Sequence, residues 1–304
     1  MQNSEIKIEN EKLKSELKIF KLKALKEKIV IIGVTLLLIA EVFLLFAFFK
    51  KALLPSKPIT KPYIAVININ KTITVPYIDK LMAKMDALKK DKNCKEFLLI
   101  FNTPGGSPSA SDEFNAYLKY INKTKKVNVY VESMAASGGY YIISAIKPII
   151  ANKNAVVGSI GVIMPHFVLK KLADKIGIEE DSLTIGKYKE PVSWFRKFSD
   201  EDKKYLKDHL LLPTYDNFLK TVAQGRGIPL EKLKKYADGK IYTATLVKGI
   251  LVDKISDLIT VKENLRKKYK NVEFINIPLE RKRIPFFNIK LSSDIGEALK
   301  EIVK

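Results

Sequence analysis

Apolar and polar positions divide most of the chain into short segments of two kinds. Strand-length apolar runs, such as YIAVINI and EFLLIF, alternate with longer stretches whose apolar residues recur at helical spacing. Strands that alternate with helices predict an α/β body with a largely parallel sheet. The predicted strands are 63–69, 96–101, 127–131 and 161–164, and the predicted helices are 77–90, 109–121, 136–145, 167–176 and the long, polar 200–227.

One apolar run is much longer than a strand. Residues Ile29–Phe49 read IVIIGVTLLLIAEVFLLFAFF, 21 residues with the single charge of Glu41. A helix of this length spans the hydrocarbon core of a bilayer. No small-residue cleavage site follows it, so we expect an uncleaved signal anchor. An acid within a span marks a functional site by default, but a partner helix or protonation is the milder explanation for Glu41.

Charge around this run predicts its orientation. Residues 1–28 carry eight Lys and five Glu, and Lys is denser before the run than after it. The positive-inside rule therefore predicts a single-pass protein of the bacterial inner membrane, with a cytoplasmic N-terminus and an extracytoplasmic body. The leader itself has three open interpretations: a short coiled coil, a helix on anionic lipid, or a solvated helix.

The pattern divides the chain into five parts. A basic tail (1–28) and the anchor (29–49) precede a proline-containing linker (50–62). A catalytic body is expected over 63–260 and a C-terminal extension over 261–304.

Composition narrows the possible functions. The formal net charge is +21, but the Lys residues are spread along the chain without an Arg-rich block, zinc spacing or aromatic RNA-binding motif. We therefore expect a solvated Lys-rich surface and no nucleic acid partner. The single Cys94 excludes an intrachain disulfide and is expected to be structural or a surface thiol rather than a nucleophile. His166 and His209 are too few to indicate a metal cluster, and no metal or cofactor is expected.

Two glycine-containing turns could carry chemistry. The turn Asn102–Gly106 (NTPGG) follows a buried strand and precedes a helix, which leaves backbone N–H groups free to face a developing negative charge. Its plain alternative is an ordinary tight turn. In ESMAASGGYY, Ser137 lies where a strand passes into a helix, as a nucleophile does in a strand-turn-helix elbow. Its alternative is a helix N-cap.

A serine nucleophile needs a base, and neither histidine is well placed by its sequence context. A neutral lysine can serve instead, because desolvation lowers the pKa of an ammonium group. The segment GKYKEP holds two lysines, Lys187 and Lys189. Residues two apart in an extended segment point to the same side, so the pattern alone does not choose between them.

Taken together, the ordered motifs resemble one family. PGG, AASGGYY, VGSIGV, GKYKE and FRKFSDED, followed by TVAQGRGI and ADGKIYTATLVKGILVDKI, are similar to the bacterial signal peptide peptidase A family over about residues 63–258. The resemblance implies a Clp-protease/crotonase-like α/β fold with repeated β-β-α units, here joined to an N-terminal transmembrane helix. The sequence departs from the family pattern at Glu190-Pro191 and at Thr243–Val247, which puts substrate contacts in doubt more than catalysis.

The resemblance also implies roles for individual residues. Ser137 matches the nucleophile, Lys189 the base, Gly106 and Gly138 the oxyanion donors, and Ser159 a secondary position. It implies a ring-like homo-oligomer in which Ser137 and Lys189 come from adjacent protomers, with the helix 200–227 at the interface. The expected substrates are cleaved signal peptides and other apolar peptides near the membrane. The alternatives are a non-catalytic scaffold of the same fold and a crotonase-type thioester enzyme.

Overall fold

The computed structural model describes residues 2–53, 59–269 and 271–279; within the first range it describes the side chains of residues 14, 17–44 and 46. The chain divides into two units, Met1–Pro58 and Ile59–Lys304, each described here by itself.

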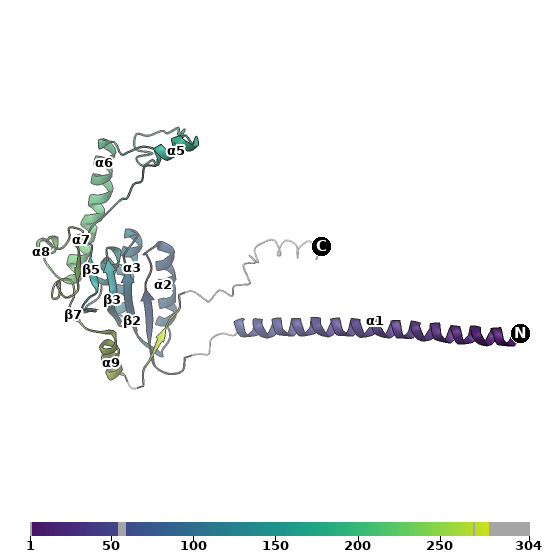
Figure 1. Ribbon diagram of the computed structural model, residues 1–304. Helices are drawn as coiled ribbons and strands as arrows, with labels where there is room; N and C mark the ends of the chain where they lie inside the picture. Colours follow the sequence, from purple (N-terminus) through teal and green to yellow (C-terminus); the bar gives the residue numbers. More distant parts are fainter. Residues whose placement is uncertain (1, 54–58, 270, 280–304) are drawn as a thin grey trace, which may run out of the picture. The chain divides into compact units, whose positions relative to one another are not determined.

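The first unit is one continuous helix, α1 (Gln2–Leu53), shown in Figure 1. Its described apolar side chains between residues 29 and 46 are exposed, Val30 to 63% for example. No helix of the described residues is long and apolar enough to span a bilayer. The predicted span 29–49 includes Leu45 and residues 47–49, whose side chains lie outside the described residues, so the anchor stays a prediction.

The second unit is built on a mostly parallel sheet with strand order β6-β5-β3-β2-β1-β8. Only β6, at one edge, runs antiparallel to its neighbour, and β4 pairs with the first half of β3 and with β7. The strands are β1 (Tyr63–Ile69), β2 (Cys94–Thr103), β3 (Val127–Ala136), β4 (Ile149–Ala151), β5 (Val156–Gly158), β6 (Ile241–Thr243), β7 (Lys254–Ile255) and β8 (Glu273–Asn276).

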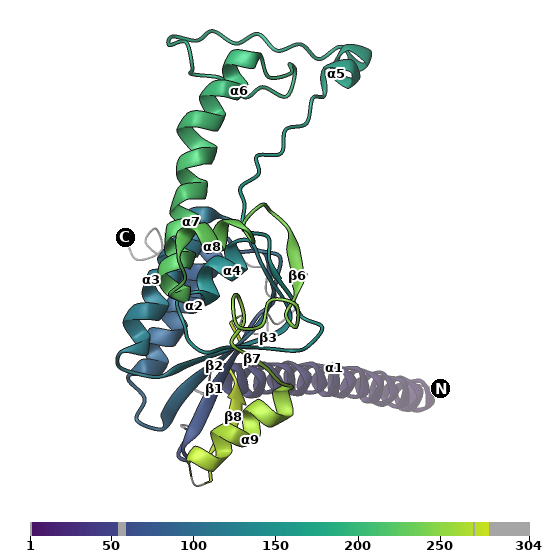
Figure 2. The same ribbon diagram turned by 90° about the vertical axis from the view of Figure 1, so that its left-hand side faces the viewer.

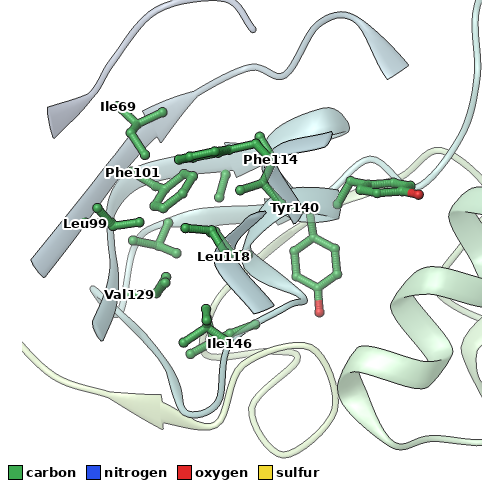
Figure 3. Packing of buried hydrophobic residues seen from close by; sticks show 14 of the residues in the cluster. Ile69, Leu99, Phe101, Phe114, Leu118, Val129, Tyr140 and Ile146 are labelled. Carbon is green, nitrogen blue, oxygen red and sulfur yellow. The ribbon is translucent and has the colours of Figure 1, made fainter. Parts of the chain in front are cut away.

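Helices cover both faces of the sheet. Figure 3 shows Leu99, Phe101 and Val129 of the central strands packed against Phe114 and Leu118 of α3. The other face packs on α9 through Val261 and Leu265, a smaller cluster that also includes Ile64 and Val66 of β1. The nearly continuous apolar run YIAVINI therefore serves two cores, one on each side of the sheet. The helices of this unit are α2 (Val75–Lys89), α3 (Pro108–Asn122), α4 (Gly138–Ile143), α5 (Lys170–Ile176), α6 (Asp200–Leu206), α7 (Leu212–Arg226), α8 (Leu230–Lys234) and α9 (Leu258–Lys268), with a π-helical turn, η1 (Lys207–Leu211), between α6 and α7.

An α/β fold is confirmed, and several predicted details are corrected. The chain alternates one strand and one helix from β1 to α4; two successive strands precede a helix only at β4-β5-α5 and β6-β7-α9. Residues 161–164 are not a strand; the strand is β5, earlier, because Val156–Gly158 are the residues that pair with the end of β3. The predicted boundary at residue 260 falls inside α9, and β8 continues the sheet beside β1, so residues up to 276 belong to the folded unit.

Residues 164–199, here called the arm, leave the sheet after β5 and lead to α6, from which η1 and α7 run back toward the sheet (Figure 2). Figure 2 shows α5 and α6 at the far end of this excursion, away from the strands. Many of its apolar side chains are exposed, including Phe167, Leu172 and Trp194.

Candidate active site

The site lies at the carboxyl edge of two central parallel strands. β2 ends in the Thr103-Pro104-Gly105-Gly106 turn, and β3 ends directly before Ser137. In open α/β sheets, ligands bind at this edge, outside the carboxyl ends of the strands. Sheet topology therefore brings together two motifs that lie 31 positions apart in the sequence.

Ser137 occupies a strained turn between β3 and α4. Its φ is +50°, a conformation that few residues other than glycine adopt. Its N–H donates to the Gly158 carbonyl at 2.9 Å, and its own carbonyl accepts from the Tyr141 N–H at 3.0 Å. Ser137 is the N-cap residue of α4, but its side chain makes no capping bond to the helix, so the hydroxyl is not used as a cap. Ser137 is half-buried and lines a cavity of about 800 Å³.

The turn after β2 is ordered by Thr103. Its buried hydroxyl donates to the Lys71 carbonyl at 2.7 Å and accepts from the Gly105 N–H at 3.2 Å. Ile73 then joins the turn in a bridge, accepting from Ser107 and donating to Gly105 at 2.8 Å each. This pairing does not use the Gly106 N–H. A side chain at Gly106 would lie 2.2 Å from the Ile73 carbonyl oxygen, so only glycine fits.

Gly106 and Gly138 lie side by side. A Cβ built on Gly138 would be 3.2 Å from the Gly106 nitrogen and 2.4 Å from Ser111 Oγ. Gly138 is the first residue of α4, where N–H groups have no partner within the helix. Within the described part of the chain, neither glycine N–H donates a hydrogen bond outside helix and strand pairing. Two such donors next to a serine hydroxyl are the components of an oxyanion hole.

Two cavities meet at Ser137. The larger one has apolar walls from Val162, Ile163, Leu211 and Leu212, together with the polar Ser159 and Tyr215. A smaller one, about 110 Å³, is lined by Gly106 and by residues of α4, which begins at Gly138, and of α7. It is lined by Ser111, Tyr141, Val162, Ile163, Thr214 and Phe218, among others. An extended apolar chain laid across Ser137 would therefore meet apolar surface on both sides.

Ser159 lines the same cavity as Ser137. It has φ +52°, and its N–H donates to the Lys240 carbonyl at 2.7 Å. It follows Gly158, whose carbonyl holds Ser137, and both serines line the larger cavity.

Lys189 is not brought to Ser137 within one chain. It is exposed, lies in the arm, and is not among the residues lining either cavity at Ser137. Its segment is nevertheless held in place, since Tyr188 stacks on Tyr205 with ring centroids 4.3 Å apart and donates to Glu201 at 2.9 Å. Lys187 pairs with the same Glu201, and this hydrogen bond raises the pKa of Lys187.

The other titratable candidates lie elsewhere. Cys94 is buried at the start of β2, and burial raises the pKa of its thiol, as expected of a structural residue. His166 contacts the Ser193 carbonyl at 2.8 Å in the arm, and His209 packs near Tyr205. No cluster of His, Cys, Asp and Glu suited to a metal ion occurs among the described residues.

Sequence reasoning missed most of the cavity walls. Leu211 and Leu212, together with Lys207 and Tyr215, come from the helix that was assigned to a protomer interface. The run Leu210-Leu211-Leu212 in an otherwise polar segment was the available signal. The π turn that contains Lys207 and Leu211 leaves no mark in the sequence pattern.

A serine on a strand-to-helix turn, with two free N–H groups beside it and an apolar cleft across it, defines a hydrolase of the acyl-transfer type. Residues 119–273 match peptidase family S49. A protein of Methanocaldococcus jannaschii with a provisional protease name is 35% identical over 224 residues, which cover 72% of this chain and 71% of that protein.

Two further relatives carry more specific names. A protein of Enterococcus faecium, provisionally named a signal peptide peptidase, is 30% identical over 71% of this chain and 63% of its own length. A chloroplastic serine protease of Arabidopsis thaliana is 30% identical over 54% of this chain and 24% of its own length. The chain belongs to peptidase family S49, within the signal peptide peptidase A group, and is a serine peptidase.

Proposed function

We propose that the protein is a membrane-anchored endopeptidase that cleaves apolar peptides, signal peptide remnants among them, through a Ser137–Lys189 dyad. The observation that carries this proposal is the position of Ser137: a strained turn, with its hydroxyl on an apolar cavity and the Gly106 and Gly138 N–H groups beside it. The apolar walls supply affinity for apolar side chains roughly in proportion to the area they bury.

The reaction begins when a neutral lysine takes the Ser137 proton. The Ser137 oxygen attacks the peptide carbonyl, and the Gly106 and Gly138 N–H groups hold the oxyanion of the tetrahedral intermediate. Lysine then gives its proton to the leaving amine, which leaves an acyl-enzyme. Water, deprotonated by the same lysine, hydrolyses the ester and restores Ser137.

The location of Lys189 supports a base supplied by a neighbouring protomer. In one chain it lies on the arm, in a turn held by Tyr188, Tyr205 and Glu201, whereas Ser137 lies at the sheet edge. The arm also exposes apolar side chains such as Phe167 and Trp194, which a second copy would cover. A ring of copies, each offering its arm to the next, would complete every site. We also propose that the fold belongs to the Clp-protease/crotonase-like class, because the resemblance to the signal peptide peptidase A family implies that fold.

Anchoring rests on the apolar run 29–49 and on the exposure of its described side chains along α1. We propose that it spans the inner membrane with the Lys-rich leader in the cytoplasm. Protease added to cells with an opened outer barrier should digest the body and spare residues 1–28. Protection of the body would reverse this orientation.

The test of the activity compares Ser137→Ala with Ser159→Ala, which removes the neighbouring hydroxyl of the same cavity. A fluorophosphonate probe should label the wild type and Ser159→Ala, and should not label Ser137→Ala. Hydrolysis of an apolar fluorogenic peptide should disappear with the label. Labelling or near wild-type hydrolysis in Ser137→Ala would reject Ser137 as nucleophile. A folded wild type that neither reacts with the probe nor hydrolyses the peptide would favour a non-catalytic scaffold.

A further inference from the structure

The larger cavity at Ser137 contains a cation to which neither the proposed mechanism nor the family resemblance gives a role. Lys207, the first residue of the π turn η1, lines this cavity together with Ser137. Among the described residues that line it, Lys207 is the only one with a positive charge. Its neighbours on the same wall, Leu211 and Leu212, are apolar.

Lys207 is unpaired within the part of the chain that the structure describes. Its ammonium group makes no hydrogen bond or ion pair with any residue in the described ranges. This distinguishes it from nearby lysines, because Lys203 pairs with Asp200 and Lys187 with Glu201. The charge is thus available to a molecule in the cavity.

The acidic residue of the same cavity, Asp238, already has an ion-pair partner. Asp238 pairs with Lys240 at 2.6 Å, and this hydrogen bond lowers the pKa of Asp238 and keeps it ionised. Tyr215 of α7 fixes the adjacent loop by donating to the Ala237 carbonyl at 2.5 Å. Lys207 and Asp238 therefore do not neutralise each other, and the cavity keeps one unmatched positive charge.

The cavity lysine is the first residue of a π turn. Lys207, at the start of the turn, and Leu211, at its end, line the same cavity, as residues four apart on one face of a helix can. π turns of this kind are frequent at functional sites.

We infer that Lys207 binds a carboxylate of the peptide, supplied either by its free C-terminus or by an acidic side chain. Apolar walls with one unmatched cation suit a peptide that is apolar along most of its length and carries one negative charge. A C-terminal carboxylate of this kind is what an earlier proteolytic cleavage leaves on its product. The site would then favour peptides released by another protease over internal segments of intact chains. This inference rests on the proposed peptidase activity.

The experiment uses the full-length protein in detergent and one apolar fluorogenic peptide in matched forms. A C-terminal acid is compared with the C-terminal amide, and an internal Glu with Gln in the amide series. For the wild type, kcat/KM should be about fivefold higher for one acidic form than for its neutral partner, as for a partly exposed charge pair, and salt should reduce the ratio. The pair that shows the preference identifies the source of the carboxylate.

Lys207→Met should bring that ratio close to one, and Lys207→Arg should keep it. Lys232→Met, on α8 and outside the cavity, is the matched control and should keep the wild-type ratio. Equal rates for acidic and neutral peptides in the wild type would overturn the inference, as would an unchanged ratio in Lys207→Met. Loss of all hydrolysis in folded Lys207→Met would also overturn it, because it would make Lys207 part of catalysis. If the wild type cleaves no peptide at all, the proposed peptidase activity fails first.

Discussion

Lys187 and Glu201 form an ion pair of 2.5 Å that holds the arm turn against α6. The hydrogen bond from Lys187 to Glu201 raises the pKa of this lysine, which favours its charged form. A general base must lose its proton before it can act, so this pairing argues against Lys187 as the base. The structure thus separates two lysines that the sequence pattern left equivalent.

We therefore predict different outcomes for the two lysines. Lys189→Ala should lower kcat at least 10²- to 10⁴-fold, roughly the contribution of a positioned base. Lys187→Ala should keep most of the activity, with some loss from a less ordered turn. Both are measured by steady-state hydrolysis of an apolar peptide, with circular dichroism as the check on folding. Full activity in Lys189→Ala would remove the Ser-Lys mechanism.

The proposed oxyanion hole can be tested by a substitution that introduces a steric clash at Gly138. In Gly138→Ala the new methyl group would meet Ser111 Oγ at 2.4 Å and the Gly106 nitrogen at 3.2 Å. The turn must shift to relieve this contact, which misplaces both N–H groups. We expect kcat to fall about 10²-fold or more, the cost of losing one oxyanion donor.

A double variant tests whether the loss of activity comes from the clash between the new methyl group and Ser111. Ser111→Ala removes the closer of the two contacts, at the cost of the bond from Ser111 Oγ to the Ser107 carbonyl. Gly138→Ala with Ser111→Ala should recover part of the activity if the turn was displaced by the clash. Wild-type kcat in the single Gly138→Ala variant would refute the placement of the oxyanion hole here.

Stability at low pH should depend on Glu96, a buried carboxylate in β2. Burial alone would raise its pKa, but hydrogen bonds from Lys268, Tyr269 and Asn128 outweigh burial and hold the pKa below its usual value of 4.5. A carboxyl group with a lowered folded-state pKa contributes stability above its unfolded pKa, and this contribution is lost as pH falls through the folded pKa.

Thermal unfolding should therefore show a loss of stability as pH falls below about 4.5. Glu96→Gln should lower the free energy of unfolding at pH 7 by about 2 kcal/mol, because it removes the charge on which three donors converge. The same variant should show a weaker pH dependence below pH 4.5 than the wild type. Parallel pH profiles for the two proteins would contradict this role of Glu96.

The turn that carries Ser137, the proposed nucleophile, could be predicted from the sequence because its signals are local. A strand followed by Ser137-Gly138-Gly139, and a strand followed by Pro104-Gly105-Gly106, each specify a turn by residue type. Parallel strands then place both turns at one edge. The nearly continuous apolar runs in β1 and β2 likewise predict strands that are buried on both faces.

The elements that could not be predicted from the sequence depend on contacts between residues far apart in the chain. Val156–Gly158 is a strand because it pairs with the end of β3, and β8 is one because it pairs with β1. Residues 161–164 have the composition of a strand but find no partner, and instead line the cavity at Gly161, Val162 and Ile163. The π turn that begins at Lys207 is a feature of the backbone geometry, and the spacing of apolar residues does not predict it.

The central claim is that Ser137 of one protomer and Lys189 of the next form one dyad, and subunit mixing tests it most directly. Ser137→Ala and Lys189→Ala proteins, each inactive alone, are dissociated, mixed and reassembled, with mixing verified by differently tagged subunits. We predict that hydrolysis returns, because some interfaces pair an intact Ser137 with an intact Lys189. In a large ring mixed at random from equal amounts, about a quarter of the sites should be restored. No activity after verified mixing would contradict a dyad shared between protomers.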